Sequence, residues 1–120
     1  MDHGPLDIPQ VTGLRAFADN YIWVLRQHGN AVVVDPGEAR PALEYLRESG
    51  ERLTAILVTH HHPDHVGGVD AICDRFDVPV FGPLAENIPR RNHDLRGGDR
   101  IEGPGLDGYW DVLDVGGQSR

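Results

Sequence analysis

A cluster of histidine residues near the middle of the chain is the part of the sequence best suited to chemistry. Four of the seven histidines fall between positions 60 and 65, in the run Thr-His-His-His-Pro-Asp-His-Val-Gly-Gly. The pattern His-x-His-x-Asp-His combines three imidazoles with one carboxylate, in His60, His62, Asp64 and His65. Imidazole and carboxylate groups together suit zinc, and also iron or manganese. We therefore predict that this segment binds divalent metal ions.

The flanking sequence indicates how four donors could converge on metal ions. Residues 55–58 form an apolar run that predicts a buried strand. Side chains two apart on a strand lie on one face, so His60 and His62 can reach a single cation at the strand's end. Pro63 fixes its own φ and biases the preceding residue away from helical geometry. The chain should therefore turn there and bring in the last two donors from another direction.

Simpler explanations of the histidines are a purification tag or a polar loop that happens to be rich in histidine. A tag is normally contiguous and terminal, whereas this cluster is interrupted and internal. A sulfur-rich structural site is excluded because the chain has one cysteine, Cys73, which we expect to be a small core residue rather than a nucleophile. Metal binding remains the preferred interpretation.

Length and composition narrow the possible classes of protein. A chain of 120 residues predicts one domain over 1–120. No apolar run approaches the roughly 20 residues of a transmembrane helix, and the first residues lack signal-peptide features. With a single cysteine, these features predict a cytoplasmic protein without a membrane partner. The net charge of −8 argues against nucleic acid as a partner. The sequence leaves the oligomeric state open.

Hydrophobic patterns predict an alternation of strands and helices. The expected strands cover residues 11–16, 21–27, 31–35, 53–58 and 78–81, with a last pair at 100–101 and 109–115 after a loop at 84–98. The expected helices cover residues 40–49 and 66–76 and connect strands, which is typical of an α/β sheet. The histidine cluster then follows a strand's carboxyl end, where open α/β sheets usually place their sites.

Three segments resemble the metallo-β-lactamase superfamily: the histidine run at 59–68, Asp-Pro-Gly-Glu at 35–38 and Asp-Asn-Tyr-Ile-Trp at 19–23. The last two are most similar to the hydroxyacylglutathione hydrolases, also called glyoxalase II. The resemblance extends from about residue 11 to about residue 115 and covers the first half of such an enzyme's metal-binding domain. It therefore implies an α/β chain that forms the N-terminal half of an αβ/βα sandwich.

In that family two metal ions, commonly zinc, lie at the edge of the sandwich. The resemblance gives His60 and His62 to the first ion and Asp64 and His65 to the second. It also gives Asp64 a catalytic role, to orient the nucleophilic water or accept its proton. Asp35 would help to orient the ligands, although a plain Asp-Pro-Gly turn is an equal alternative.

The implied reaction is hydrolysis of glutathione thioesters, such as S-lactoylglutathione to lactate and glutathione in methylglyoxal detoxification. Zinc lowers the pKa of a bound water to about 7, and this makes a nucleophile available at neutral pH. The histidine pattern alone does not select the substrate. Another enzyme of the same fold, such as an iron-dependent persulfide dioxygenase, and a non-catalytic remnant that binds one cation are the alternatives.

The sequence also departs from the family pattern. His61 occupies a variable position, and His93 matches no family ligand. This sequence has no counterpart of the family's later ligands, one of which lies in a Pro-Gly-His-Thr segment, or of its glutathione-binding residues. In the family pattern, two complete metal sites share about seven protein donors. We therefore expect a truncated chain that is inactive or severely impaired by itself. We also expect marginal stability, because one sheet face would lack its partner layer.

Four arginines, at positions 90, 91, 96 and 100, could suggest an anion site. Acidic residues at positions 94, 99 and 102 are interleaved with them. We interpret the segment as a solvated, charge-balanced loop.

Overall fold

The computed structural model describes residues 10–16, 20–59, 66–83, 88, 90–96, 99–103, 105–106 and 109–111. Its elements, in chain order, are β1 (Gln10–Ala16), β2 (Asn20–Gln27), β3 (Asn30–Val34), α1 (Ala39–Ser49), β4 (Arg52–Leu57), α3 (Val69–Arg75), β5 (Val80–Pro83), β6 (His93–Leu95), β7 (Arg100–Glu102) and β8 (Tyr109–Asp111). Strands and helices thus alternate through the middle of the chain, as the hydrophobic patterns predict.

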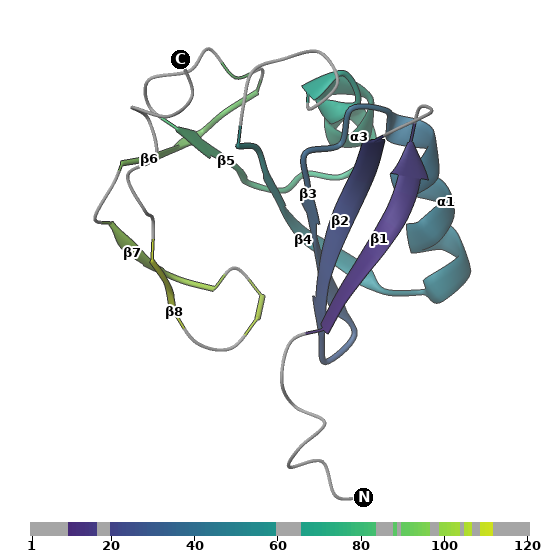
Figure 1. The fold of residues 1–120 in the computed structure, drawn as a ribbon, viewed down its shortest axis with the longest axis horizontal. Helices are drawn as coiled ribbons and strands as arrows, with labels where there is room; N and C mark the ends of the chain where they lie inside the picture. Colours follow the sequence, from purple (N-terminus) through teal and green to yellow (C-terminus); the bar gives the residue numbers. More distant parts are fainter. Residues whose placement is uncertain are drawn as a thin grey trace, which may run out of the picture.

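Strands β1 to β6 form one sheet in sequence order, and β7 pairs with β8 separately (Figure 1). The pairs β1–β2 and β2–β3 are antiparallel, whereas β3–β4, β4–β5 and β5–β6 are parallel. The carboxyl ends of β3, β4 and β5 therefore meet at one edge of the sheet, which confirms the predicted α/β class.

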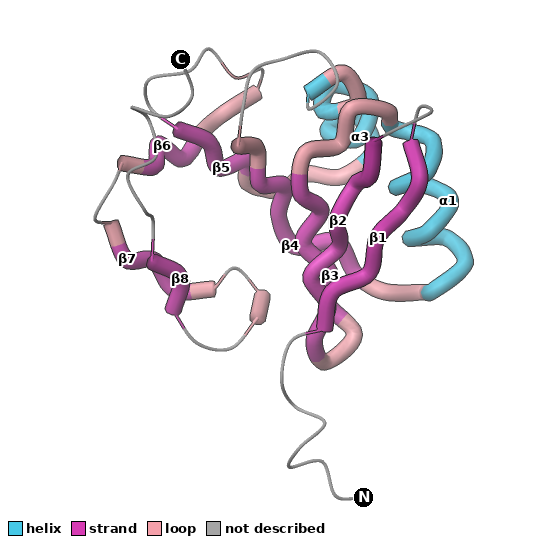
Figure 2. Tube along the Cα trace, in the orientation of Figure 1, coloured by secondary structure: helices cyan, strands magenta, loops and turns pink. Residues whose placement is uncertain are grey.

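Both helices lie on the same side of the sheet (Figure 2). Helix α1 buries Ala42 and Leu46, which are four positions apart and so share one face. It ends at Gly50, whose φ of 72° is left-handed and favours glycine. Helix α3 buries Val69 and Ile72 against the same layer. Neither described helix is long and apolar enough to cross a membrane.

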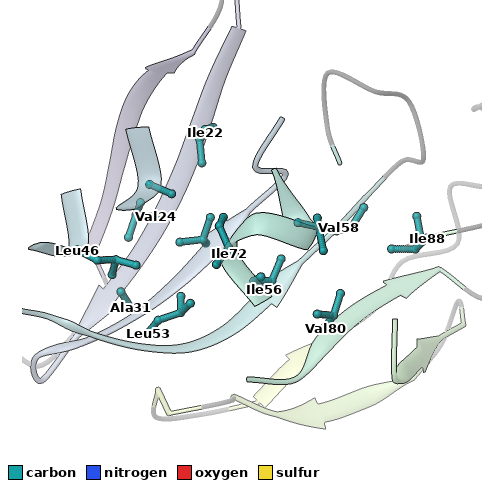
Figure 3. Close-up of a cluster of buried hydrophobic side chains, with 13 residues drawn as sticks. Ile22, Val24, Ala31, Leu46, Leu53, Ile56, Val58, Ile72, Val80 and Ile88 are labelled. Carbon is teal, nitrogen blue, oxygen red and sulfur yellow. The ribbon is translucent and has the colours of Figure 1, made fainter. Parts of the chain in front are cut away.

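The main core lies between the helices and the sheet (Figure 3). The side chains of Ile22, Val24, Ile56 and Ile72 are at most 1% exposed there. A second buried cluster consists of Val32, Ala55, Phe81 and Leu106. Along β3 and β4, Val32 and Ala55 alternate with residues of the main core, so their side chains point to the other face of the sheet. The second cluster therefore covers part of that opposite face.

The opposite face also carries exposed apolar side chains on β1 and β2. Val11, Tyr21 and Trp23 are 61%, 49% and 45% exposed. The rings of Tyr21 and Trp23 stack with centroids 5.5 Å apart, and Trp23 lies over Gly13, where an added Cβ would come within 2.8 Å of the ring. These three side chains are therefore only partly covered, while the missing partner layer and the marginal stability stay predictions.

Strand β6 is a correction to the sequence analysis, which placed a loop at 84–98. Its three residues show no strand periodicity, and polar side chains outside the strand support its position. The Asn92 side chain accepts a hydrogen bond from the Val80 amide at 2.9 Å. Arg91 donates to the Pro83 carbonyl at 2.7 Å. Strand β6 thus depends on long-range hydrogen bonds that the sequence pattern does not reveal.

Smaller differences concern element boundaries. Strand β5 covers 80–83 rather than 78–81, and α3 begins at Val69 after a turn at Gly67 and Gly68, rather than at 66. Strand β3 ends at Val34, before the residue where we placed its end. The predicted strand at 109–115 is confirmed as β8 up to residue 111, and its last four residues lie outside the described part of the chain.

A polar network connects β2 to the segment between α1 and β4. The Glu51 carboxylate accepts hydrogen bonds from Tyr45 Oη at 2.5 Å and from Arg26 Nε at 2.8 Å. Burial of the hydroxyl, together with this hydrogen bond, raises the pKa of Tyr45 to about 12. The neutral phenol is therefore the form that stabilises the fold.

This pKa predicts how stability changes at high pH. The folded-state pKa of Tyr45 lies above its unfolded value of 10.0, so the stabilisation is fully present below pH 10 and is lost as the pH rises towards 12. Tyr45→Phe lacks the ionisation and should be less stable than the parent by about 1 kcal/mol at pH 7. Urea unfolding should show that this difference is constant from pH 7 to 9 and shrinks above pH 10. A constant difference up to pH 12 would argue against the network.

Candidate metal centre

The structure does not describe the predicted metal ligands, which are His60, His62, Asp64 and His65. Their convergence on metal ions therefore stays a prediction. The catalytic role of Asp64 also stays a prediction. Within the described part of the chain, no group of three or more histidine, cysteine, aspartate or glutamate side chains is placed to hold a metal ion. What the structure describes is the framework on both sides of the cluster, up to Thr59 and again from residue 66.

Three parallel strands are joined at the edge where the cluster begins. The Asp35 amide donates to the Leu57 carbonyl at 2.8 Å, and the Val58 amide donates to the Phe81 carbonyl at 2.8 Å. These hydrogen bonds continue the β3–β4 and β4–β5 ladders to their carboxyl ends. The histidine cluster therefore starts from a rigid sheet edge rather than from a free loop.

The Asp35 carboxylate fixes the residue that directly precedes His60. Its Oδ1 accepts a hydrogen bond from the Thr59 amide at 2.7 Å, and its Oδ2 accepts one from the Thr59 hydroxyl at 2.6 Å. Asp35 is 9% exposed and has a φ of 54°. Hydrogen bonds to an ionised carboxylate are short and strong, so both oxygens hold the start of the cluster.

Asp35 thus fits both interpretations that the sequence left open. It is a turn residue, because its left-handed φ is one that aspartate tolerates better than most residues. It also orients the backbone next to the predicted ligands, through Thr59. Its effect on the ligands themselves is a proposal, since those residues are not described.

The same turn also contacts the far end of the cluster. The Gly68 amide donates to the Pro36 carbonyl at 2.7 Å. The sequence predicts no role for Thr59 or Gly68, and for Pro36 only a place in an Asp-Pro-Gly turn. The available signal was their position, because Thr59 and Gly68 border the cluster and Pro36 follows Asp35.

His93 and Cys73, for which the sequence predicts no part in the chemistry, have structural contacts. The His93 ring packs against Phe81 with centroids 4.5 Å apart and the ring planes tilted by 34°, and its Nδ1 lies 2.8 Å from the Asn92 side-chain oxygen. Cys73 packs against the main core, and burial raises the pKa of its thiol. A raised pKa lowers the thiolate fraction, as expected for a core cysteine and not for a nucleophile.

The arginine-rich segment is charge-balanced, as predicted, but not only by its own acidic residues. Arg91 Nε pairs with Asp94 at 2.8 Å. Arg90 instead reaches helix α3, where it pairs with Asp70 at 3.0 Å and Asp74 at 2.7 Å. These pairs support a structural interpretation of the segment over an anion site.

Comparison with known proteins identifies the family. A profile described as the metallo-beta-lactamase superfamily matches residues 17–119, which is most of the chain. The chain belongs to this superfamily. Members of this superfamily use divalent metal ions, which is in keeping with the donor types in the histidine cluster.

Curated relatives of this superfamily chain confirm the resemblance to the hydroxyacylglutathione hydrolases. The protein of that name from Methylobacillus flagellatus is 47% identical over 110 residues, which are 92% of this chain and 44% of the relative. The protein of the same name from Nitrosomonas europaea is 43% identical over 106 residues, 88% of this chain and 40% of the relative. The chain thus spans about two fifths of the length of these relatives.

Two solved structures share the fold of this chain. ETHE1 from Myxococcus xanthus has a TM-score of 0.64 at 22% identity, over 79% of this chain and 43% of that one. TTHA1623, solved in a di-iron-bound form, has a TM-score of 0.59 at 25% identity, over 87% of this chain and 66% of that one. The partial coverage fits the N-terminal half of a metallo-β-lactamase fold.

Proposed function

We propose that this chain is the N-terminal half of the catalytic domain of a hydroxyacylglutathione hydrolase, over residues 1–120. In this proposal His60 and His62 bind one divalent metal ion, and Asp64 and His65 bind a second. Zinc is the proposed metal, and iron or manganese could replace it. The substrate is a glutathione thioester, with S-lactoylglutathione as the representative compound, and the reaction takes place in the cytoplasm.

The observation that carries the proposal is the buried Asp35 carboxylate, which holds Thr59 with both oxygens beside the first predicted ligand. A ligand-bearing segment needs such support, because residues that orient ligands commonly change metal affinity by about 10- to 100-fold. The donor set of three imidazoles and one carboxylate fits divalent first-row metals. The relatives named hydroxyacylglutathione hydrolase support the proposed reaction, and the di-iron-bound form of TTHA1623 supports the proposed number of two metal ions.

The proposed chemistry assigns a distinct task to each part of the chain. The bound ions would supply an acidified water and stabilise the negative charge that develops on the thioester oxygen. The Asp64 carboxylate would orient that water or accept its proton. The leaving thiol, with a pKa of about 8.5 if it resembles cysteine, needs little help from a general acid. Asp35 and Thr59 would keep the ligand segment in place while the reaction proceeds.

The 120-residue chain by itself should not turn over thioesters. Its four predicted donors cannot complete two centres that share about seven. A hydrolysis assay with S-lactoylglutathione on the zinc-, iron- and manganese-loaded chain should therefore give the background rate. Turnover by the isolated chain at an enzymatic rate would contradict this part of the proposal.

A chimera tests the reaction itself. In it, this chain replaces the matching residues of the Methylobacillus flagellatus protein, to which it is 47% identical. The chimera should hydrolyse S-lactoylglutathione, and Asp64→Asn should lower kcat by about 100-fold or more while metal is retained. Asp77→Asn, at an exposed aspartate after α3, is the matched control and should not change the rate. A metal-loaded chimera without hydrolysis, or full activity in Asp64→Asn, would overturn the assignment.

A further inference from the structure

The turn between β3 and α1 contacts both ends of the histidine cluster. At the first end, Asp35 accepts two hydrogen bonds from Thr59, at 2.7 and 2.6 Å. At the second end, the Pro36 carbonyl accepts a hydrogen bond from the Gly68 amide at 2.7 Å. Residues 59 and 68 are therefore attached to two consecutive residues of one turn.

The contact at Gly68 leaves no room for a side chain. A Cβ added to Gly68 would lie 2.8 Å from the Glu38 carbonyl oxygen, and closer still to the Glu38 carbonyl carbon and the Ala39 nitrogen. All three are backbone atoms at the start of α1, so they cannot move aside as a flexible side chain could. The φ of Gly68 is −98°, which any residue adopts. Close approach, and not backbone conformation, is what requires glycine here.

Gly68 also links the turn to α3. Its carbonyl accepts a hydrogen bond from the Ile72 amide at 3.1 Å, which begins the helix. Val69 and Ile72 of that helix are 0% exposed, and they anchor it in the core. The position of Gly68 is therefore fixed from both sides, by the turn at Pro36 and by the packing of α3.

We propose that Gly68 is a positioning residue for metal binding, because it closes the ligand segment onto the turn at residues 35–38. Thr59 and Gly68, which border the predicted ligands, are then held on one turn before any ion binds, and such preorganisation favours binding. Releasing Gly68 from the turn therefore weakens metal binding. This inference rests on the proposed function, since it takes the ligands to be His60, His62, Asp64 and His65.

Gly68→Ala is the direct test, with hydrogen exchange and zinc affinity as separate readouts on the 120-residue chain. Exchange of the Thr59 amide and of the amide at 68 should become faster by on the order of tenfold without metal. Zinc affinity, measured by competition with a chromogenic chelator, should fall by about tenfold or more. Unchanged zinc affinity in a folded Gly68→Ala chain would overturn the proposal.

Gly50→Ala is the matched control at the other end of α1. Gly50 has a φ of 72° and no atom within 4 Å of an added Cβ, so alanine there strains the backbone without a new contact. It should lower the urea midpoint and leave the zinc affinity and both amides unchanged. An equal loss of zinc affinity in Gly50→Ala would show that general destabilisation is the cause and would overturn the role of Gly68.

The parent chain provides a second test in case Gly68→Ala does not fold. Zinc should slow exchange of the Thr59 and Gly68 amides by the same factor, since both attach one segment to one turn, and leave the Gly50 amide unchanged. Different factors for the two amides would overturn the proposal. If zinc does not bind at all, while Gly68→Ala still accelerates both amides, the proposed function fails and the closure of the segment stands.

Discussion

Asp35→Ala should weaken zinc binding by about 10- to 100-fold, the usual effect of removing a group that orients metal ligands. The substitution removes the carboxylate that accepts both hydrogen bonds from Thr59, next to the first predicted ligand. It should also lower the free energy of unfolding by about 2–4 kcal/mol, because two hydrogen bonds to a charged group are lost and alanine tolerates the left-handed φ less well. Chelator competition and urea unfolding measure the two effects.

Asp35→Asn separates geometry from charge at the same position. Asparagine tolerates a left-handed φ and keeps one side-chain oxygen that can accept from the Thr59 amide. It should therefore recover most of the stability and part of the zinc affinity. Asp94→Ala is the surface control, since the Asp94 side chain is half-exposed and its ion pair with Arg91 is worth at most about 1 kcal/mol. Zinc affinity equal to that of the parent in a folded Asp35→Ala chain would contradict the role of this carboxylate.

Ile56→Ala should lower the free energy of unfolding by about 3 kcal/mol, since truncating a fully buried isoleucine leaves a cavity. Ile56 is 0% exposed on β4 and lies in the middle of the main core (Figure 3). Its strand pairs with β3 on one side and β5 on the other, so the cavity would affect the whole parallel part of the sheet.

Val11→Ala is the matched control for the core variant. Val11 is 61% exposed on the edge strand β1, and its truncation should change the stability by less than about 0.5 kcal/mol. Urea unfolding followed by circular dichroism measures both variants. Equal effects of the two substitutions would mean that the interface between helices and sheet is not the main source of stability.

The sequence predicted the central part of the fold because local patterns and tertiary structure agree there. Helix α1 has apolar positions spaced to face a sheet and a glycine at its end, and β3 and β4 contain the apolar runs 31–34 and 55–57, as is typical of buried parallel strands. Strand β6 could not be predicted, because Asn92 and Arg91 support it by hydrogen bonds to residues about ten positions away. Such contacts leave no periodic signal in the sequence.

The sequence predicts the donors of the candidate site but not the contacts that support them. Residue types and spacing predict the metal donors, which lie outside the described residues, and the family resemblance draws attention to Asp35. They could not show that Asp35 acts through Thr59, because that contact joins the ends of two parallel strands 24 positions apart in the chain. The role of Gly68 was hidden for a similar reason, since it depends on the close approach of the first turn of α1.

Zinc titration of histidine variants is the sharpest test of the metal proposal. The chain provides its own matched control, because His61 lies among the predicted ligands yet is not one of them. We expect His60→Ala, His62→Ala and His65→Ala each to weaken zinc binding by about tenfold or more, as loss of a ligand requires. His61→Ala should bind zinc like the parent chain. Zinc affinity that is unaffected in the first three variants, or reduced as much in His61→Ala, would contradict the proposed metal centre.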